Sequence, residues 1–246
     1  MYLRLLLKRK QPPAFLCMIP YIFTLLNAFF GFLSIIKSLE NDFTTAAYFM
    51  LLAALMDGLD GRLARTLGST SYFGQELDSL CDAISFCLAP TVLLYCWFPG
   101  NFSRIGVCIL GIYVCAGVWR LARFNVNTTK TVSAYFTGLP TTLAAFFIAS
   151  FILYAPWLAT HSGNFLFSHK ALCLMVFTLA ALMVSSIPFT TLKRYKITSV
   201  YEAIKCGLFS IFMIWCTIYH YPCFLFLITG YIGYNSLYFF TQAVVK

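Results

Sequence analysis

The chain has few charged residues. Only 10% of its 246 residues are Asp, Glu, Lys or Arg, whereas 61% are hydrophobic. A soluble domain normally carries about 25% charged residues, so this composition argues against a soluble protein. Apolar runs of about 20 residues recur along the chain, and each is long enough to cross a bilayer as a helix. The composition therefore predicts an all-α, polytopic transmembrane helical bundle.

Residues that commonly bind zinc or form disulfides are scarce or scattered. The chain has three histidines, none near another ligand type in sequence, and its ten cysteines include no CxxC pair. Nearly all of the cysteines lie inside apolar runs, where cysteine behaves as a small apolar residue. We therefore expect neither a histidine metal site nor a disulfide framework.

The apolar runs predict about eight membrane spans. They cover residues 15–38, 43–63, 80–97, 105–119, 136–158, 171–187, 203–219 and 222–244. Connections between them are short, so we expect residues 1–246 to form a single membrane domain.

Basic residues predict the orientation of this bundle. With both termini in the cytoplasm, fourteen of the 17 Lys and Arg residues fall on the cytoplasmic side, as the positive-inside rule requires. We therefore expect a multi-pass protein of the cytoplasmic (inner) membrane. The net charge of +9 is then explained by topology and by attraction to anionic headgroups, not by nucleic-acid binding.

Acidic residues are rare and unevenly placed. Five of the eight lie within residues 57–82, although an ionisable group at membrane depth costs roughly 2.5–3.5 kcal/mol. Asp57 and Asp60 are three residues apart, and Asp78 and Asp82 are four apart, so each pair shares one helix face. The span directions place both pairs near the cytoplasmic end of the bundle. A hairpin between the two spans would bring all four carboxylates together.

Four converging carboxylates repel one another unless a cation lies between them. Ligation by oxygen alone suits Mg²⁺, Mn²⁺ or Ca²⁺ and does not suit zinc. The nearby Arg62 and Arg65 can pair with phosphate oxygens. The segment therefore predicts a metal-dependent pyrophosphate pocket that faces the cytoplasm.

The same segment resembles the signature of the CDP-alcohol phosphatidyltransferases. It reads Asp57-x-x-Asp60-Gly61-x-x-Ala64-Arg65, then eight residues, then Gly74-x-x-x-Asp78-x-x-x-Asp82, which fills all eight specified positions. The resemblance implies an enzyme that uses an alcohol to displace CMP from a CDP-activated lipid. It also implies a divalent cation, Mg²⁺ or Mn²⁺, with two ions in each active site, and a homodimer.

Further stretches resemble the membrane-embedded bacterial phosphatidylserine synthases of this family. They are "IPYIFTLLNAFFGFLSI", "FGQELDSLCDAISFCLAPT", "RLARFNVNT" and "FTGLPTT". The implied activity is that of a CDP-diacylglycerol–serine O-phosphatidyltransferase, which transfers the phosphatidyl group to L-serine in phospholipid biosynthesis. One position departs from the subgroup, because Tyr21 stands where an asparagine is usual.

The resemblance implies a role for individual residues. Asp57, Asp60 and Asp78 would hold one metal ion, Asp57, Asp78 and Asp82 would surround a second, and Asp82 would be the catalytic base. The residues implied in binding the CDP-lipid are Thr24, Asn27, Gly61, Arg65, Ser71 and Gly74. Arg120, Arg123 and Asn125 would bind the acceptor, with Arg123 preferred for the serine carboxylate.

Two alternatives stay open at this stage. The first is a transferase of the same family that uses glycerol 3-phosphate, inositol phosphate or choline. Choline favours an aromatic cage, and a phosphorylated acceptor favours a denser basic cluster. The second is a cation or proton transporter that uses intramembrane aspartates, although such sites lie near the midplane between repeated halves.

Overall fold

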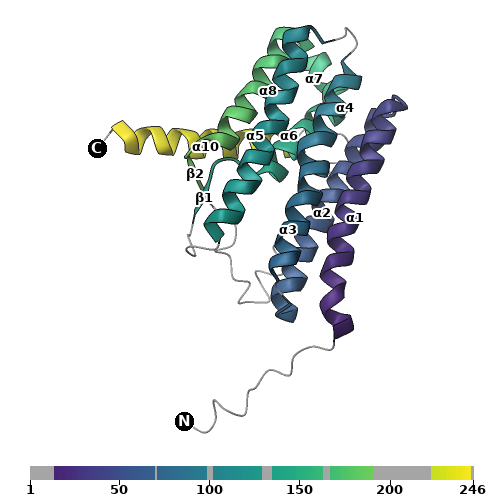
Figure 1. The fold of residues 1–246 in the computed structure, drawn as a ribbon. Coiled ribbons are helices and arrows are strands. Elements are labelled where there is room, and N and C mark those ends of the chain that lie inside the picture. The colour runs from purple at the N-terminus through teal and green to yellow at the C-terminus, as the bar shows by residue number, and fades with distance from the viewer. Residues whose placement is uncertain are drawn as a thin grey trace.

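The part of the chain that the structure describes folds almost entirely into helices. The computed structural model describes residues 14–69, 71–98, 102–128, 135–162, 167–190 and 223–244 (Figure 1). The helices are α1 (Ala14–Leu39), α2 (Phe43–Leu67), α3 (Tyr72–Asp82), the π-helical segment η2 (Ala83–Leu88), α4 (Ala89–Trp97), α5 (Arg104–Thr128), α6 (Thr141–Leu153), α7 (Ala155–Ser162), α8 (His169–Val184) and α10 (Cys223–Val244). Short connections between successive helices make α1, α2 and the continuous α3–η2–α4 helix antiparallel neighbours.

Four helices are long and apolar enough to cross a membrane. They cover Met18–Leu39, Phe43–Leu67, Tyr72–Trp97 and Arg104–Val126, and the shorter apolar helices are Thr141–Leu153 and His169–Val184. The prediction of a helical membrane protein is confirmed at this level. The count of eight spans and the side of each terminus stay predictions, and the expected span at 203–219 lies outside the described residues.

Three of the predicted spans differ most from the helices in the structure. The third helix begins at Tyr72, eight residues before the predicted start at 80, because the Ser71 hydroxyl accepts a hydrogen bond from the Gly74 amide and caps it. Helix α5 continues past residue 119 to Thr128, so it has 25 residues and the short predicted span was wrong. The predicted span 136–158 is interrupted at Tyr154, between α6 and α7.

A four-residue turn joins α2 to α3. Helix α2 ends at Gly68, which has φ +66° in the left-handed region, and its amide bonds the carbonyl of Ala64. Glycine adopts this conformation without the steric cost that a side chain brings. Ser71 then begins α3. This tight hairpin places the last turns of α2 beside the first turns of α3.

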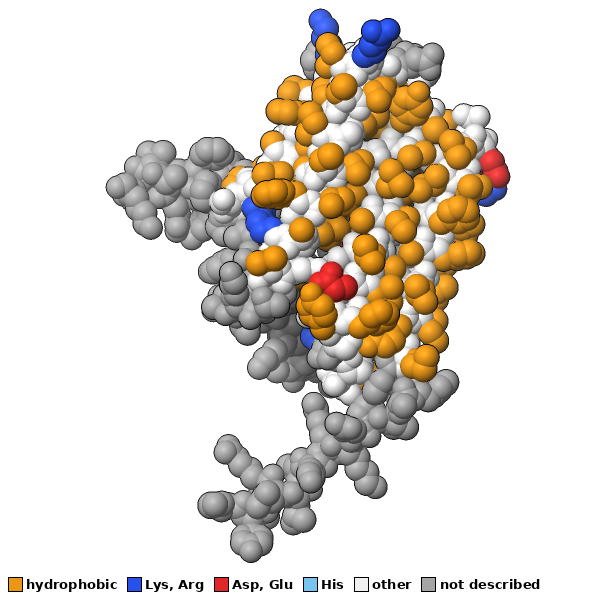
Figure 2. Space-filling model, in the orientation of Figure 1, with side chains coloured by type: hydrophobic (Ala, Val, Ile, Leu, Met, Phe, Trp, Pro, Cys, Tyr) orange, Lys and Arg blue, Asp and Glu red, His pale blue; other side chains and the backbone are white. Residues whose placement is uncertain are grey.

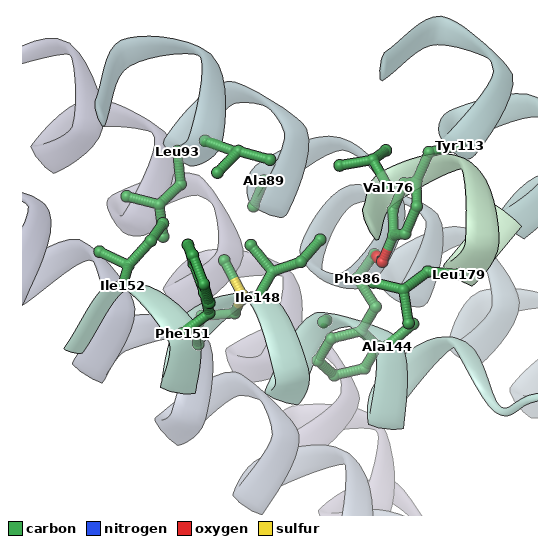
Figure 3. Close-up of a cluster of buried hydrophobic side chains, with 14 of the residues drawn as sticks. Phe86, Ala89, Leu93, Tyr113, Ala144, Ile148, Phe151, Ile152, Val176 and Leu179 are labelled. Carbon is green, nitrogen blue, oxygen red and sulfur yellow. The ribbon is translucent and has the colours of Figure 1, made fainter. Parts of the chain in front are cut away.

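The apolar core lies where η2, α4, α5, α6 and α8 meet (Figure 3). Phe86, Leu93, Ile148 and Val176 are all fully buried there. Tyr113 is also fully buried, and its hydroxyl donates to the carbonyl of Phe86 at 3.3 Å. This carbonyl belongs to η2, the π-helical segment that begins directly after Asp82. The core therefore fixes the helix segment that follows the acidic cluster.

One short sheet departs from the predicted all-α fold. Strands β1 (Tyr135–Thr137) and β2 (Pro188–Thr190) pair antiparallel, with Phe136 opposite Phe189. The pair joins the chain before α6 to the chain after α8. Three-residue strands leave the architecture helical, while α10 runs across the other helices (Figure 1).

Hydrophobic side chains cover the face drawn in Figure 2, and charged side chains are few on it. Exposed large residues on α1 and α5 include Phe29, Phe32, Ile105 and Trp119. A soluble protein rarely exposes an apolar surface of this extent. The surface is that expected of helices in contact with lipid.

Candidate active site

Three of the four predicted aspartates converge between α2 and α3. Asp57, Asp60 and Asp78 each offer a carboxylate oxygen, and these oxygens all lie within 4.8 Å of one another. Two of the residues come from the last turns of α2, and the third comes from the second turn of α3. The hairpin through Gly68 and Ser71 therefore produces the convergence that the spacing predicts.

The acidic trio is largely withdrawn from solvent and lacks protein partners for some of its oxygens. Asp60 is only 5% exposed. Oδ2 of Asp60 and Oδ1 of Asp78 are buried and have no hydrogen-bond partner in the part of the chain that the structure describes. Buried carboxylate oxygens normally have a partner, so these atoms point to a ligand between the helices. An all-oxygen donor set of this kind fits a hard divalent cation.

Asp82 lies one turn beyond Asp78 and has a different environment. It is 8% exposed, and its Oδ1 accepts a hydrogen bond of 3.0 Å from Nδ2 of Asn27 on α1. The backbone carbonyl of Asn27 in turn accepts from the Ser85 hydroxyl at 2.9 Å. The group of carboxylates that can share one ion contains Asp57, Asp60 and Asp78 but not Asp82. A second metal site that includes Asp82 stays a prediction.

The residues predicted to bind the CDP-lipid lie on α1 and α2 and at the start of α3. Thr24 lies within hydrogen-bonding range of Asp60 and is 4% exposed, and Arg65 lies within electrostatic range of Asp60. Arg65 is exposed and lies across from Gly61, where an added Cβ would be 3.6 Å from Nη1 of the arginine. Asn27 is fully buried; its Nδ2 donates to Asp82, and its Oδ1 has no hydrogen-bond partner among the described residues.

Ser71 and Gly74 lie against Tyr21, the residue that departs from the subgroup pattern. The Tyr21 hydroxyl lies 2.7 Å from the Ser71 hydroxyl, and an added Cβ on Gly74 would be 2.9 Å from the Tyr21 ring. The ring also packs edge-on against Phe73, with centroids 5.9 Å apart. Tyr21 therefore holds the start of α3, which carries two of the four aspartates.

A model of the CDP-alcohol phosphatidyltransferase family matches residues 17–241. The chain belongs to this family. Similar proteins include the CDP-diacylglycerol–serine O-phosphatidyltransferase of Helicobacter pylori, which is 35% identical over 181 residues, 74% of this chain and 75% of that protein. The archaetidylserine synthase of Methanothermobacter thermautotrophicus is 37% identical over 173 residues, 70% of this chain and 69% of that one. The CDP-diacylglycerol–serine O-phosphatidyltransferase of Mycobacterium leprae is 34% identical over 220 residues, covering 83% and 72% of the two chains.

In this phosphatidyltransferase the two candidate acceptor arginines of α5 differ in their surroundings. Arg120 is 7% exposed and lies within electrostatic range of Asp57 and Asp82. Its Nη1 also donates to the hydroxyl of Thr141 at 3.3 Å, at the start of α6. A buried cation beside the acidic cluster is suited to hold an anionic group near the metal site.

Arg123 instead hydrogen-bonds carbonyls at the C-terminal end of α8. Its Nη1 donates to the carbonyl of Val184 at 2.9 Å, and its Nη2 donates to those of Met183 and Ser185 at 3.1 and 3.2 Å. The last carbonyls of a helix lack partners within the helix, and an arginine satisfies them well. The acceptor role of Arg123 stays a prediction, but its guanidinium already has this structural task.

Asn125 links α5 to the helix that carries Asp78 and Asp82. Its Oδ1 accepts from the Ser79 hydroxyl at 3.1 Å, and its Nδ2 donates to Oε2 of Glu76 at 3.4 Å. Of these residues only Asn125 was a predicted site residue. Glu76 and Ser79 were missed because they fall between the specified positions of the signature, although Glu76 is one of only eight acidic residues.

Proposed function

We propose that this family member transfers the phosphatidyl group of CDP-diacylglycerol to the hydroxyl of L-serine and releases CMP. The observation that carries the proposal is the convergence of Asp57, Asp60 and Asp78 within 4.8 Å, built from the family signature. The similarity to named serine phosphatidyltransferases supports serine as the acceptor. The chemistry of the site residues is consistent with this reaction.

The reaction exchanges one phosphodiester bond for another. The serine oxygen bonds to the phosphorus that carries diacylglycerol, the bond from that phosphorus to the oxygen of CMP breaks, and the serine proton is removed. Mg²⁺ or Mn²⁺, when bound, neutralises charge on the pyrophosphate and on departing CMP, and we infer two ions per site. Asp57, Asp60 and Asp78 would hold the first, and Asp57, Asp78 and Asp82 the second. Arg65, Thr24, Gly61, Ser71 and Gly74 would receive the nucleotide and its phosphates.

Asp82 is our proposed general base. Asn27 holds its Oδ1, which leaves Oδ2 to accept the serine proton. Both residues are buried, so the carboxylate is held in one orientation by the contact between α1 and α3. The role of Asn27 in this proposal is to position Asp82 rather than to touch the nucleotide.

Asn27→Ala therefore tests the positioning role. A hydrogen bond to a charged group contributes about 1.5–3 kcal/mol, so we expect kcat to fall roughly 10- to 100-fold. The KM for CDP-diacylglycerol should be unchanged. Ser34→Ala is the matched control, because Ser34 lies on α1 and bonds the carbonyl of Ala46 at 2.8 Å, away from the acidic cluster. A rise in the KM for CDP-diacylglycerol with unchanged kcat would instead make Asn27 a nucleotide contact.

We assign the serine carboxylate to Arg120, with Asn125 nearby on the same helix. Arg120→Ala should raise the KM for serine by roughly 30-fold or more, because a buried charge pair loses one partner. Arg123→Ala should leave that KM near the wild-type value and lower the melting temperature, since three carbonyls at the end of α8 lose their donor. Steady-state kinetics and thermal unfolding in detergent check both. The opposite pattern would return the acceptor role to Arg123.

We also infer a single membrane domain over residues 1–246 with about eight spans and both termini in the cytoplasm. The family match over residues 17–241 and the distribution of basic residues support this arrangement. In this arrangement the active site lies at the cytoplasmic side of the inner membrane. A homodimer is part of the same proposal.

The direct assay is CMP release from CDP-diacylglycerol by the purified protein in detergent with Mn²⁺. Serine, glycerol 3-phosphate, inositol phosphate, inositol and choline are offered in turn. We expect release with serine, and phosphatidylserine as the lipid product. Release with a different alcohol would keep the reaction class and change the acceptor. No release with any alcohol would contradict the proposal and favour a transporter.

A further inference from the structure

The first turn of α6 lies beside the acidic trio. Helix α6 packs against α2, and the Thr142 hydroxyl lies within hydrogen-bonding range of the Asp57 carboxylate. The neighbouring Thr141 is fully buried, and its hydroxyl accepts a hydrogen bond from Nη1 of Arg120 at 3.3 Å. Arg120 itself lies within electrostatic range of Asp57. These contacts together place the start of α6 next to the turn of α2 that carries Asp57.

The chain before α6 holds this turn in place. Gly138 has φ +83°, and its amide donates to the carbonyl of Ile187 at 2.9 Å. The amide of Leu139 donates to the carbonyl of Leu182 at 3.0 Å, and the Leu139 side chain is fully buried. An added Cβ on Gly138 would collide with the backbone at the end of α8, which accounts for glycine at this point. The Thr142 hydroxyl therefore extends from a backbone that is fixed on both sides.

A hydroxyl beside Asp57 has a defined use if Asp57 is a metal ligand. A carboxylate that coordinates a cation normally accepts a further hydrogen bond, which fixes its orientation. The proposed function assigns Asp57 to both ions, so its orientation affects both. Thr142 lies on α6, outside the two helices that carry the trio. It can therefore hold the Asp57 carboxylate from the side opposite to its own helix backbone.

We propose that Thr142 is a positioning residue of the metal site, whose hydroxyl donates to Asp57 and orients that carboxylate toward Asp60 and Asp78. This inference rests on the proposed function, because it requires the trio to bind a divalent cation. It also gives the first turn of α6 two tasks. Through two successive threonines, this turn contacts both a metal ligand and the arginine assigned to the acceptor carboxylate.

Thr142→Val removes the hydroxyl and nearly retains the shape of the side chain. Mn²⁺ titration of the purified protein in detergent, followed by electron paramagnetic resonance of the free ion, should show affinity roughly 10- to 100-fold below that of the wild type. The Mn²⁺ concentration for half-maximal CMP release should rise in parallel. Saturating Mn²⁺ should restore most of the turnover, because no group that contacts a substrate is lost. Thr142→Ser retains the donor and should recover most of the Mn²⁺ affinity.

Thr178→Val is the matched control, because the Thr178 hydroxyl is exposed on α8 and donates to the Leu174 carbonyl of its own helix at 2.7 Å. It should bind Mn²⁺ as the wild type does. Equal Mn²⁺ affinity in Thr142→Val and the wild type would overturn the inference, as would equal losses in Thr142→Val and Thr142→Ser. If Thr142→Val does not fold, Thr142→Ala lacks the same hydroxyl and takes its place.

The wild type separates failure of this inference from failure of the proposed function. If it binds Mn²⁺ and releases CMP with serine, an unchanged Thr142→Val overturns the role of Thr142 alone. If it binds Mn²⁺ but releases no CMP with any alcohol, the proposed function fails, and the Mn²⁺ affinities still decide the role of Thr142. A wild type that binds no Mn²⁺ would overturn both.

Discussion

Asp82→Asn should abolish transfer while the protein still binds CDP-diacylglycerol. The substitution keeps the shape of the side chain and an oxygen for the Asn27 amide, but it removes the atom that accepts the serine proton. General-base catalysis contributes about 10²–10⁴-fold to a reaction rate, so kcat should fall by at least roughly 10²-fold. The KM for CDP-diacylglycerol should change far less. Steady-state CMP release at saturating serine measures both quantities.

Asp42→Asn provides the control for this variant. Asp42 lies at the turn between α1 and α2, where its side chain accepts from the Thr45 amide and caps α2. Asparagine caps a helix about as well as aspartate, so this variant makes the same chemical change without loss of the cap. It should retain wild-type turnover. Turnover close to wild type in Asp82→Asn would refute the base role and leave Asp82 with the metal ions alone.

Asp78→Asn should remove both turnover and the response of the protein to divalent ions. Asp78 is the one member of the trio that α3 supplies, so a cation that bridges α2 and α3 depends on it. Loss of a residue that merely supports a metal ligand costs roughly 10- to 100-fold in affinity or activity, and loss of a ligand should cost at least as much. Turnover should fall by at least roughly 100-fold.

Thermal unfolding gives a readout for the same variant that does not depend on catalysis. A ligand that binds only the folded state raises the melting temperature. Mn²⁺ should therefore stabilise the wild type and leave Asp78→Asn unchanged. The metal-free variant should fold at least as well as the metal-free wild type, because one of three mutually repelling charges is gone. An equal Mn²⁺ shift in both proteins would contradict the trio as the binding site.

The acidic trio could be predicted from sequence because short-range geometry determines it. Helical spacing places Asp57 and Asp60 on one face, and a tight turn then folds α3 back beside α2. Both features depend on residues that are close together in the chain. The convergence of these three residues was therefore predictable, whereas the hydrogen bond that Asp82 accepts from Asn27 involves a third helix and was not.

The roles of the α5 arginines could not be predicted in the same way. Arg123 donates hydrogen bonds to three backbone carbonyls at the end of α8. Every residue has a backbone carbonyl, so the residue types do not show which carbonyls an arginine will contact. Hydropathy also placed the end of α5 near residue 119, because charged residues follow. The helix continues past both arginines, and each donates to the protein: Arg120 to the Thr141 hydroxyl and Arg123 to carbonyls at the end of α8. Long-range partners of this kind are visible only in the folded chain.

We expect Asp57, Asp60 and Asp78 to bind one divalent cation together. Mn²⁺ titration of the purified protein in detergent, followed by electron paramagnetic resonance of the free ion, measures this without any substrate. The wild type and Asp42→Asn should bind Mn²⁺ with the same affinity, and Asp78→Asn should bind it at least roughly 10- to 100-fold more weakly. Equal binding by all three proteins would contradict the account.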